Sequence, residues 1–251
     1  MTASEILQFI GEKARRTESG LANILGTFVA ASFDKQRHLA DLVGERDWHF
    51  DMVTGRLSFG SHFYWRSQIL GSESESSGTW RWAWANDLSN IPEDLLQASL
   101  TMRAFAEQYE IRELTVPELP LDEINGHRLS LLASGICEGN AYYRGPYEGG
   151  AAFFLIRDDS FPQNSESPLA RITSLFPQAI SALEIPNHRL ALIAYLASYR
   201  ILGRSEGNAL FVEENGKKAL TASFDDQNRL VMLETAFGKK EAHECRIDPL
   251  D

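Results

Sequence analysis

Three side chains with chemically active groups alternate in the segment DWHFD: Asp47, His49 and Asp51. Successive side chains of a β-strand point to opposite faces, so these three would project from one face in steps of about 7 Å. Two carboxylates and an imidazole at this spacing can hold a metal ion or tune the imidazole. We therefore take these residues as the centre of a candidate polar face.

Neighbouring strands are expected to extend this polar face. The residues there that can donate, accept or move protons are His62, Arg66 and Arg81. The alternative interpretation is a solvated sheet face with cross-strand ion pairs, which antiparallel sheets commonly have. A functional site would need a cover, and the polar segment GSESESSG at 71–78 is the candidate lid.

Three further residues are candidate ligand contacts: Trp84, Asn86 and Arg144. Arg144 can bind a carboxylate or a phosphate, although an arginine beside a turn often makes a structural hydrogen bond instead. Asn86 follows the last of several tryptophans, where a turn or a helix start is the competing interpretation.

Composition and motifs narrow the possible functions. The chain carries 35 acidic and 24 basic side chains, a net charge of −11, which repels nucleic acid and anionic lipid but would steer a basic protein toward it. The histidines show no zinc-type spacing, and the sequence has no phosphate loop, dinucleotide glycine fingerprint or G-x-S-x-G motif. We therefore predict no metal, no cofactor and no familiar enzyme class.

The sequence favours a cytoplasmic location. Its first residues, MTASEILQFIGEKARR, do not resemble a secretory signal, and no segment is apolar enough to span a membrane. Cys137 and Cys245 lie far apart and form no motif, as expected for reduced thiols.

The hydrophobic pattern predicts an α+β fold in which an antiparallel meander packs against helices. Two helices are expected within 4–43, and hairpins are expected at Thr54-Gly55 and Gly149-Gly150. Further helices are predicted after Pro92 and within 122–136.

A polar segment with two prolines predicts a linker at 158–168, which divides the chain into an N-terminal domain at 1–157 and a C-terminal unit at 169–251. The second unit should contain two helices, the first interrupted at Pro177, and three strands with a tight turn at Asn215-Gly216.

The segment GTWRWAWAN poses a separate question. On a strand, Trp80, Trp82 and Trp84 would share one face, where they would form either a core or a groove for a flat or apolar ligand. A core is the favoured interpretation because large exposed apolar patches are uncommon on soluble monomers.

This segment also carries a resemblance. Residues 80–86, Trp-Arg-Trp-Ala-Trp-Ala-Asn, resemble a motif of an uncharacterised bacterial family of unknown function, and the resemblance extends over about residues 30–157. It implies a bacterial source and a domain boundary near residue 157, but it implies no activity.

Together these features predict a cytoplasmic binding or interaction protein, of which an immunity-like protein that neutralises a basic partner is one form. The alternative is a small-molecule binder or enzyme that uses Asp47, His49 and Asp51, with Arg66 and Arg81 for an anionic group. A purely structural subunit is the third hypothesis. The sequence does not determine the oligomeric state.

Overall fold

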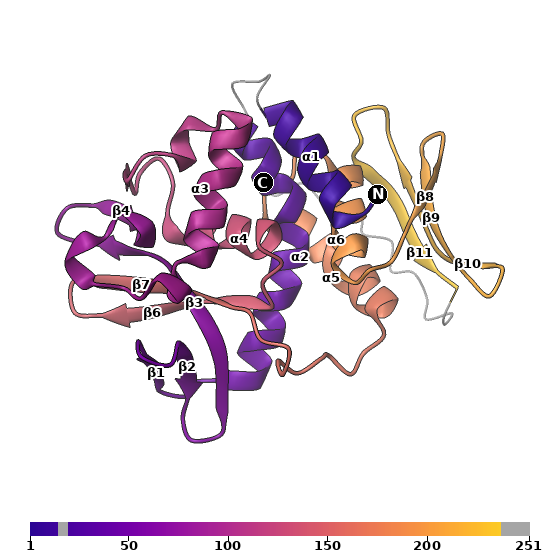
Figure 1. Cartoon of the computed structure of the whole chain (residues 1–251). Helices are drawn as coiled ribbons and strands as arrows, with labels where there is room; N and C mark the ends of the chain where they lie inside the picture. Colours follow the sequence, from indigo (N-terminus) through magenta and orange to yellow (C-terminus); the bar gives the residue numbers. More distant parts are fainter. Residues whose placement is uncertain (15–19, 237–251) are drawn as a thin grey trace, which may run out of the picture.

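The computed structural model describes residues 1–14 and 20–236, and it places a layer of helices between two antiparallel sheets (Figure 1). One sheet has seven strands and comes from the N-terminal part of the chain, and the other has four and comes from the C-terminal part. The fold is therefore α+β, as predicted. Cys245 lies outside the described residues.

The seven-stranded sheet is organised around its longest strand, β3. Its strands are β1 (Trp48–Asp51), β2 (Arg56–Phe59), β3 (Phe63–Ser74), β4 (Thr79–Trp82), β5 (Glu118–Pro120), β6 (Ala141–Tyr147) and β7 (Gly150–Ile156). β1 to β5 follow one another in order, while β7 pairs with β3 and with β6. Both predicted hairpins are present, and Gly55 and Gly149 take the positive φ angles, 67° and 85°, that glycine adopts readily.

β3 supplies side chains to two different cores. In its first half, Trp65 and Ile69 pack with Phe59. The pairing with β7 shifts register between Ile69 and Gly71, and Leu70 joins a second core. Segment 71–78, expected to be a loop, instead continues β3 to Ser74, so only its last four residues form the turn.

Two of the clustered tryptophans are core residues. Trp80 and Trp82 have no exposed surface and pack edge to face with their ring centroids 5.4 Å apart. Trp84 does not share their strand face, because β4 ends at Trp82 and residues Ala83–Ala85 form a 3-10 turn. Its partly buried ring lies under the guanidinium of Arg103 instead, 4.6 Å away.

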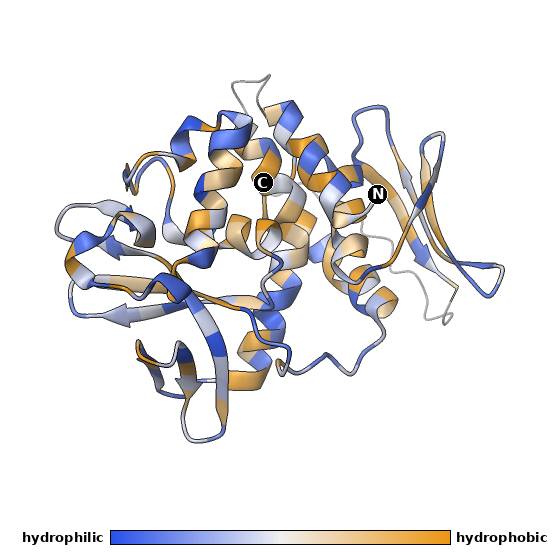
Figure 2. Ribbon diagram, in the orientation of Figure 1, coloured by the Kyte–Doolittle hydropathy of each residue, from blue (hydrophilic) through white to orange (hydrophobic). Residues whose placement is uncertain are grey.

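Helix α2 joins the two halves of the molecule. The helices are α1 (Ala3–Ala14), α2 (Gly20–Val43), α3 (Gln97–Tyr109), α4 (Gly126–Ile136), α5 (Pro168–Ala182) and α6 (His188–Ser198). In α2, Ile24 and Phe28 belong to the core of the tryptophans, whereas Val29 and Ala30 belong to the core under the C-terminal sheet. Apolar residues are concentrated in this helical layer (Figure 2).

The C-terminal sheet covers the other side of the helices. Its order is β11 (Leu230–Thr235), β10 (Lys217–Phe224), β9 (Ala209–Glu214) and β8 (Arg204–Glu206). Asn215 and Gly216 both have positive φ angles, which confirms the predicted tight turn. The strand β8 was not predicted, because its three residues are all exposed and show no alternation.

The interruption predicted at Pro177 is wrong, because α5 continues through this residue. The packed apolar face of α5 outweighs the loss of one backbone hydrogen bond. Residues 157–167 contain neither helix nor strand.

Candidate ligand-binding site

One face of α2 carries polar side chains into the interior. Ala31, Asp34, Lys35 and His38 are spaced three and four residues apart, which places them on the same side of the helix. Asp34 is buried, and Lys35 and His38 are partly buried. Polar groups removed from water need partners, and each of these three has them.

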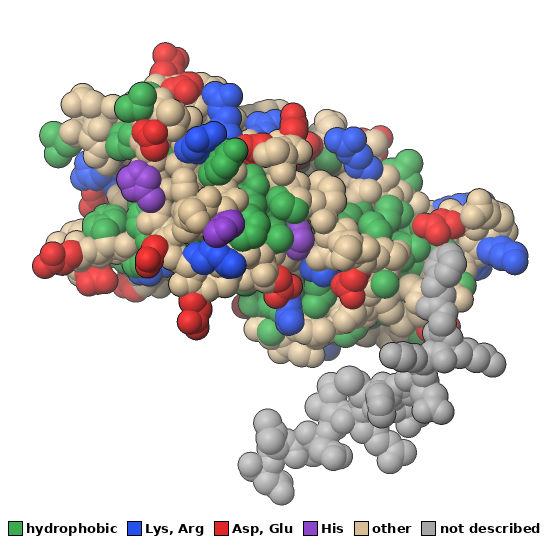
Figure 3. Space-filling model, turned by 90° about the horizontal axis from the view of Figure 1, so that it is seen from below, with side chains coloured by type: hydrophobic (Ala, Val, Ile, Leu, Met, Phe, Trp, Pro, Cys, Tyr) green, Lys and Arg blue, Asp and Glu red, His purple; other side chains and the backbone are tan. Residues whose placement is uncertain are grey.

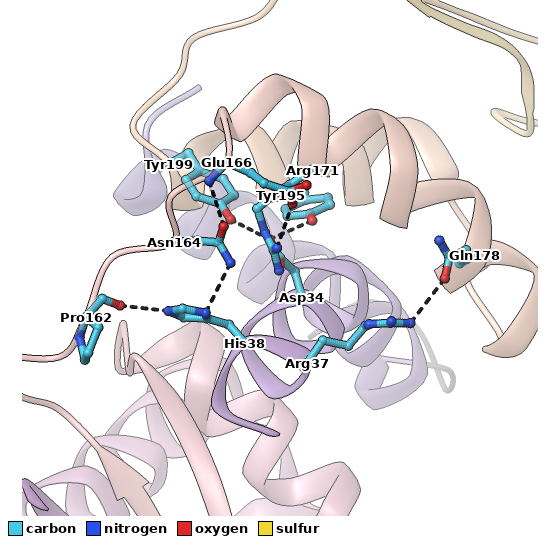
Figure 4. Close-up of polar contacts among 10 residues, drawn as sticks. All are labelled: Asp34, Arg37, His38, Pro162, Asn164, Glu166, Arg171, Gln178, Tyr195 and Tyr199. Atoms are coloured by element: carbon cyan, nitrogen blue, oxygen red, sulfur yellow. Dashed lines mark hydrogen bonds and ion pairs between the residues drawn. The ribbon is translucent and has the colours of Figure 1, made fainter. Parts of the chain in front are cut away.

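Asp34 is the centre of a buried cluster that joins α2 to α5 and α6 (Figure 4). Its Oδ1 atom accepts hydrogen bonds from Nε of Arg171 at 2.9 Å and from Nη2 of the same guanidinium. Its Oδ2 atom accepts from the hydroxyls of Tyr195 at 2.8 Å and Tyr199 at 2.5 Å. Arg171 also contacts the Glu166 carboxylate at 3.1 Å.

The electrostatics of this cluster keep the donors protonated. Burial, reinforced by the Asp34 carboxylate, raises the pKa of both Tyr195 and Tyr199 above the usual range for tyrosine. Burial lowers the pKa of Arg171, but the hydrogen bond and charge of Asp34 more than compensate, so its net shift is upward. Tyr195, Tyr199 and Arg171 therefore keep their protons near neutral pH and hold the Asp34 side chain in place.

His38 fastens the segment before α5 to the same face of α2. Its Nε2 lies 2.8 Å from the carbonyl oxygen of Pro162, and its Nδ1 lies 3.1 Å from the side-chain amide of Asn164 (Figure 4). Nε2 must donate to a carbonyl, so this network assigns the proton to Nε2 and leaves Nδ1 as the acceptor.

A cavity of about 860 Å³ adjoins this face of α2. Its walls come from α1, α2, the end of α6 and the segments at 135–140 and 161–164. Many of the lining side chains are apolar, among them Ile6, Leu7, Phe28, Phe161, Ala197 and Leu202. Leu202 is 64% exposed although it is a large apolar residue. The volume falls in the range of ligand pockets.

Lys35 supplies a cation to this cavity. Its ammonium donates to the carbonyl oxygens of Ser134 at 3.2 Å and Gly139 at 2.7 Å, at the C-terminal end of α4. Burial lowers its pKa to about 8, against the opposing effect of Glu138 and Asp34. An ammonium has three N–H donors, and the third has no partner among the described residues.

A second cavity, of about 820 Å³, has a polar lining. It contains the side chains of Arg66, Gln68, Arg157, Asp158 and Asp159 together with residues of the first cavity. The residues that line both are Glu138, Asn140, Gln163 and Arg200. The two cavities therefore adjoin, one largely apolar and the other polar.

Two of these shared residues have an unusual backbone. Glu138 and Arg200 have φ angles of 53° and 59° and directly follow the last turns of α4 and α6. The backbone hydrogen bonds Gly139 N to Ser134 O and Ile201 N to Leu196 O close both ends in the Schellman pattern, whose left-handed residue is usually glycine. Charged side chains thus occupy two positions where glycine would be less strained.

The structure places Asp47, His49 and Asp51 in and beside β1, where His49 and Asp51 interact electrostatically. Asp51 accepts hydrogen bonds from the Thr54 hydroxyl and from Val53 N in the β1–β2 turn, at 2.7 and 2.8 Å, and these bonds lower its pKa. Asp47 and His49 are exposed. Within the described residues, neither cavity is lined by Asp47, His49 or Asp51.

The remaining polar-face residues have different surroundings. His62 contacts the Ser61 hydroxyl at 3.0 Å, and Arg81 pairs with Glu118 at 2.6 Å. Arg66 lines the polar cavity and lies 3.9 Å from Asp94. In the described part of the chain, no group of three or more His, Cys, Asp and Glu side chains is arranged to hold a metal ion.

The predicted ligand contacts also lie outside the two cavities, as far as the described residues show. Arg144 lies 3.6 Å from the carboxylate of Glu73, which accepts a hydrogen bond from Gly126 N at the start of α4. Asn86 ends the 3-10 turn that holds Trp84.

Sequence reasoning missed Asp34, Lys35 and His38. A signal for them exists, because charged residues at helical spacing on an otherwise apolar stripe indicate buried polar partners. The partners themselves give no local signal, since Arg171 lies 137 positions from Asp34.

Comparison with known proteins identifies one family. The model of a family described as "Family of unknown function (DUF6882)" matches residues 22–159. No curated protein and no solved structure matches the chain. No helix among the described residues is long and apolar enough to cross a membrane.

Proposed function

The chain belongs to the family of unknown function DUF6882, and because this family has no established activity, we propose the function from the site: the protein binds a small amphipathic molecule. The observation that carries this proposal is the pair of adjoining cavities, one largely apolar and one polar. Concave apolar sites with a few convergent polar groups are the usual form of small-molecule sites.

The position of the cavities supports this function. The apolar cavity lies where α1, α2 and α6 meet, and its walls are held by the Asp34 cluster and by the contact of His38 with Pro162. Walls fixed by buried hydrogen bonds reduce the ordering cost of binding. Lys35, with its lowered pKa and a free donor toward the described cavity residues, lines this cavity from the same face of α2 as Ala31.

The proposal predicts saturable binding of N-phenyl-1-naphthylamine, an uncharged dye whose fluorescence rises in apolar surroundings. Ala197→Phe should weaken this binding at least about tenfold, because the added ring fills the cavity and excludes the dye. The measurement is a fluorescence titration of both proteins.

The matched control is Ala40→Phe, which adds the same ring at an exposed position of α2 away from both cavities. It should bind the dye as the wild type does. Equal binding by all three proteins would show that the dye occupies another place, and the proposal would fail.

A second candidate function is the binding of a basic protein. With it we propose a cytoplasmic location. The net charge of −11 favours it, because such a charge steers cationic partners. On the face shown in Figure 3, however, acidic side chains are interspersed with Lys and Arg and form no single acidic patch. Recovery of a partner at low salt that disappears at high salt would support this function.

A further inference from the structure

The charged residues of the polar cavity indicate the chemical class of the ligand. We infer that this cavity binds the anionic head group, a carboxylate or phosphate, of an amphipathic molecule whose apolar part occupies the adjoining cavity. This inference rests on the proposed function and makes it more specific. It starts from three arginines that line one cavity: Arg66, Arg157 and Arg200.

The guanidinium groups have few competing partners. Among the described residues, no side-chain hydrogen bond or ion pair engages Arg157 or Arg200, while Arg66 has the long contact to Asp94 and an electrostatic interaction with Asp158. The side chain of Arg66 is 69% exposed, so this contact contributes little. Guanidinium groups carry up to five N–H donors in a fork that matches carboxylate and phosphate oxygens.

The three carboxylates of the cavity balance the three arginines in formal charge, but none of them forms a side-chain hydrogen bond or ion pair with Arg157 or Arg200 among the described residues. Asp158 already accepts hydrogen bonds from Arg66 N at 2.7 Å and from the amide and hydroxyl of Ser160. Glu138 interacts electrostatically with the Lys35 ammonium in the apolar cavity. Asp159 is exposed, and the guanidinium groups of Arg157 and Arg200 keep their N–H donors without a partner among the described residues.

Gln68 supplies an independent observation. Its Oε1 atom is buried in the lining of the polar cavity without a hydrogen-bond partner among the described residues. A buried amide oxygen without a partner is costly, and the Nε2 atom of the same amide carries two N–H donors that have no hydrogen-bond partner among the described residues. An anion bound between the arginines would accept such a donor.

The backbone conformation at Arg200 supports the same inference. The strained left-handed position at the end of α6 carries a long cationic side chain at the junction of the two cavities. A head group bound there would lie beside Arg200 while its apolar part enters the neighbouring cavity.

The test is competition against bound N-phenyl-1-naphthylamine by three ligands with the same chain: decanoate, decan-1-ol and decyltrimethylammonium. Decanoate should compete at the lowest concentration. The overall charge of −11 attracts cations, so a preference for the anion must come from local donors. A parallel titration with decyl phosphate identifies which of the two head groups binds more tightly.

Variants assign the preference to the arginines. Arg157→Gln and Arg200→Gln should each weaken decanoate about tenfold and weaken decan-1-ol much less, since each removes a charge-assisted hydrogen bond that only the anion makes. Both residues are exposed, so the folded state should survive the substitutions. The control Arg112→Gln removes an exposed arginine outside both cavities and should change neither ligand.

The outcomes distinguish the two proposals. If the dye and decan-1-ol bind but decanoate is unaffected in the arginine variants, or if decyltrimethylammonium competes best, the head-group inference is overturned and the proposed function stands. If neither the dye nor decan-1-ol binds, the proposed function fails and the inference fails with it.

Discussion

At the scale of single residues, the contact of α2 with α5 and α6 depends on one buried carboxylate, which accepts four hydrogen bonds. Asp34 accepts from Arg171, Tyr195 and Tyr199, and these partners come from two different helices. The apolar stripe of α2 signals that Asp34 is buried, but the sequence does not identify its partners, because Arg171 lies 137 positions away. The burial of Trp80 and Trp82 was predictable because alternation in a strand is a local property.

Asp34→Asn should lower the free energy of unfolding by about 3 kcal/mol, because it leaves the buried Arg171 guanidinium with only the exposed Glu166 carboxylate as a counter-charge. Urea unfolding monitored by circular dichroism measures the change.

The matched control is Glu206→Gln, which breaks the exposed ion pair with Arg204 and should cost less than about 0.5 kcal/mol. An Asp34→Asn protein as stable as this control would show that the cluster does not hold α2 to α5 and α6.

At the scale of elements, helix ends place charge at the junction of the cavities. The sequence predicts α4 and α6 from their apolar spacing, and the structure confirms both. Their left-handed terminal residues were not predictable, since glycine, the usual signal for such an end, is replaced by Glu138 and Arg200. The predicted polar face stays a prediction, because alternation indicates a shared strand face but does not tell whether a cavity lies beside it. Of its residues, Arg66 lines a cavity.

Arg200→Gly should raise the free energy of unfolding by up to about 1 kcal/mol. Glycine adopts the left-handed conformation without strain, and the strain energy relieved exceeds the extra conformational entropy that glycine loses on folding. The same change should weaken decanoate binding about tenfold. Urea unfolding and dye competition measure the two effects.

Arg200→Ala separates strain from charge. It removes the guanidinium but keeps the left-handed position occupied by a side chain, so it should lose decanoate affinity without gaining stability. A gain in stability by Arg200→Ala as large as that of Arg200→Gly would contradict the assignment of strain to this backbone.

At the scale of the whole molecule, α2 is a shared element of two cores. The sequence predicted a boundary at 158–168, and the family match ends at residue 159. The packing of α2 against both α4 and α6 could not be predicted from the sequence, because it depends on contacts between segments far apart in the chain. The apolar cavity lies between these same elements, so its integrity depends on both halves.

This packing predicts a single cooperative unfolding transition. All five tryptophans lie in or directly after strands of the N-terminal sheet, so their fluorescence reports on that half, whereas far-ultraviolet circular dichroism reports on both. The two urea curves should coincide. A dichroism change that precedes the fluorescence change would show that the C-terminal half unfolds separately.

The most direct test of the central claim is the N-phenyl-1-naphthylamine titration of wild type, Ala197→Phe and Ala40→Phe side by side. The proposed site predicts saturable binding of one dye molecule by the wild type and by Ala40→Phe, and binding weakened at least about tenfold in Ala197→Phe. No saturable binding, or the same binding by all three proteins, would contradict a ligand site between α1, α2 and α6.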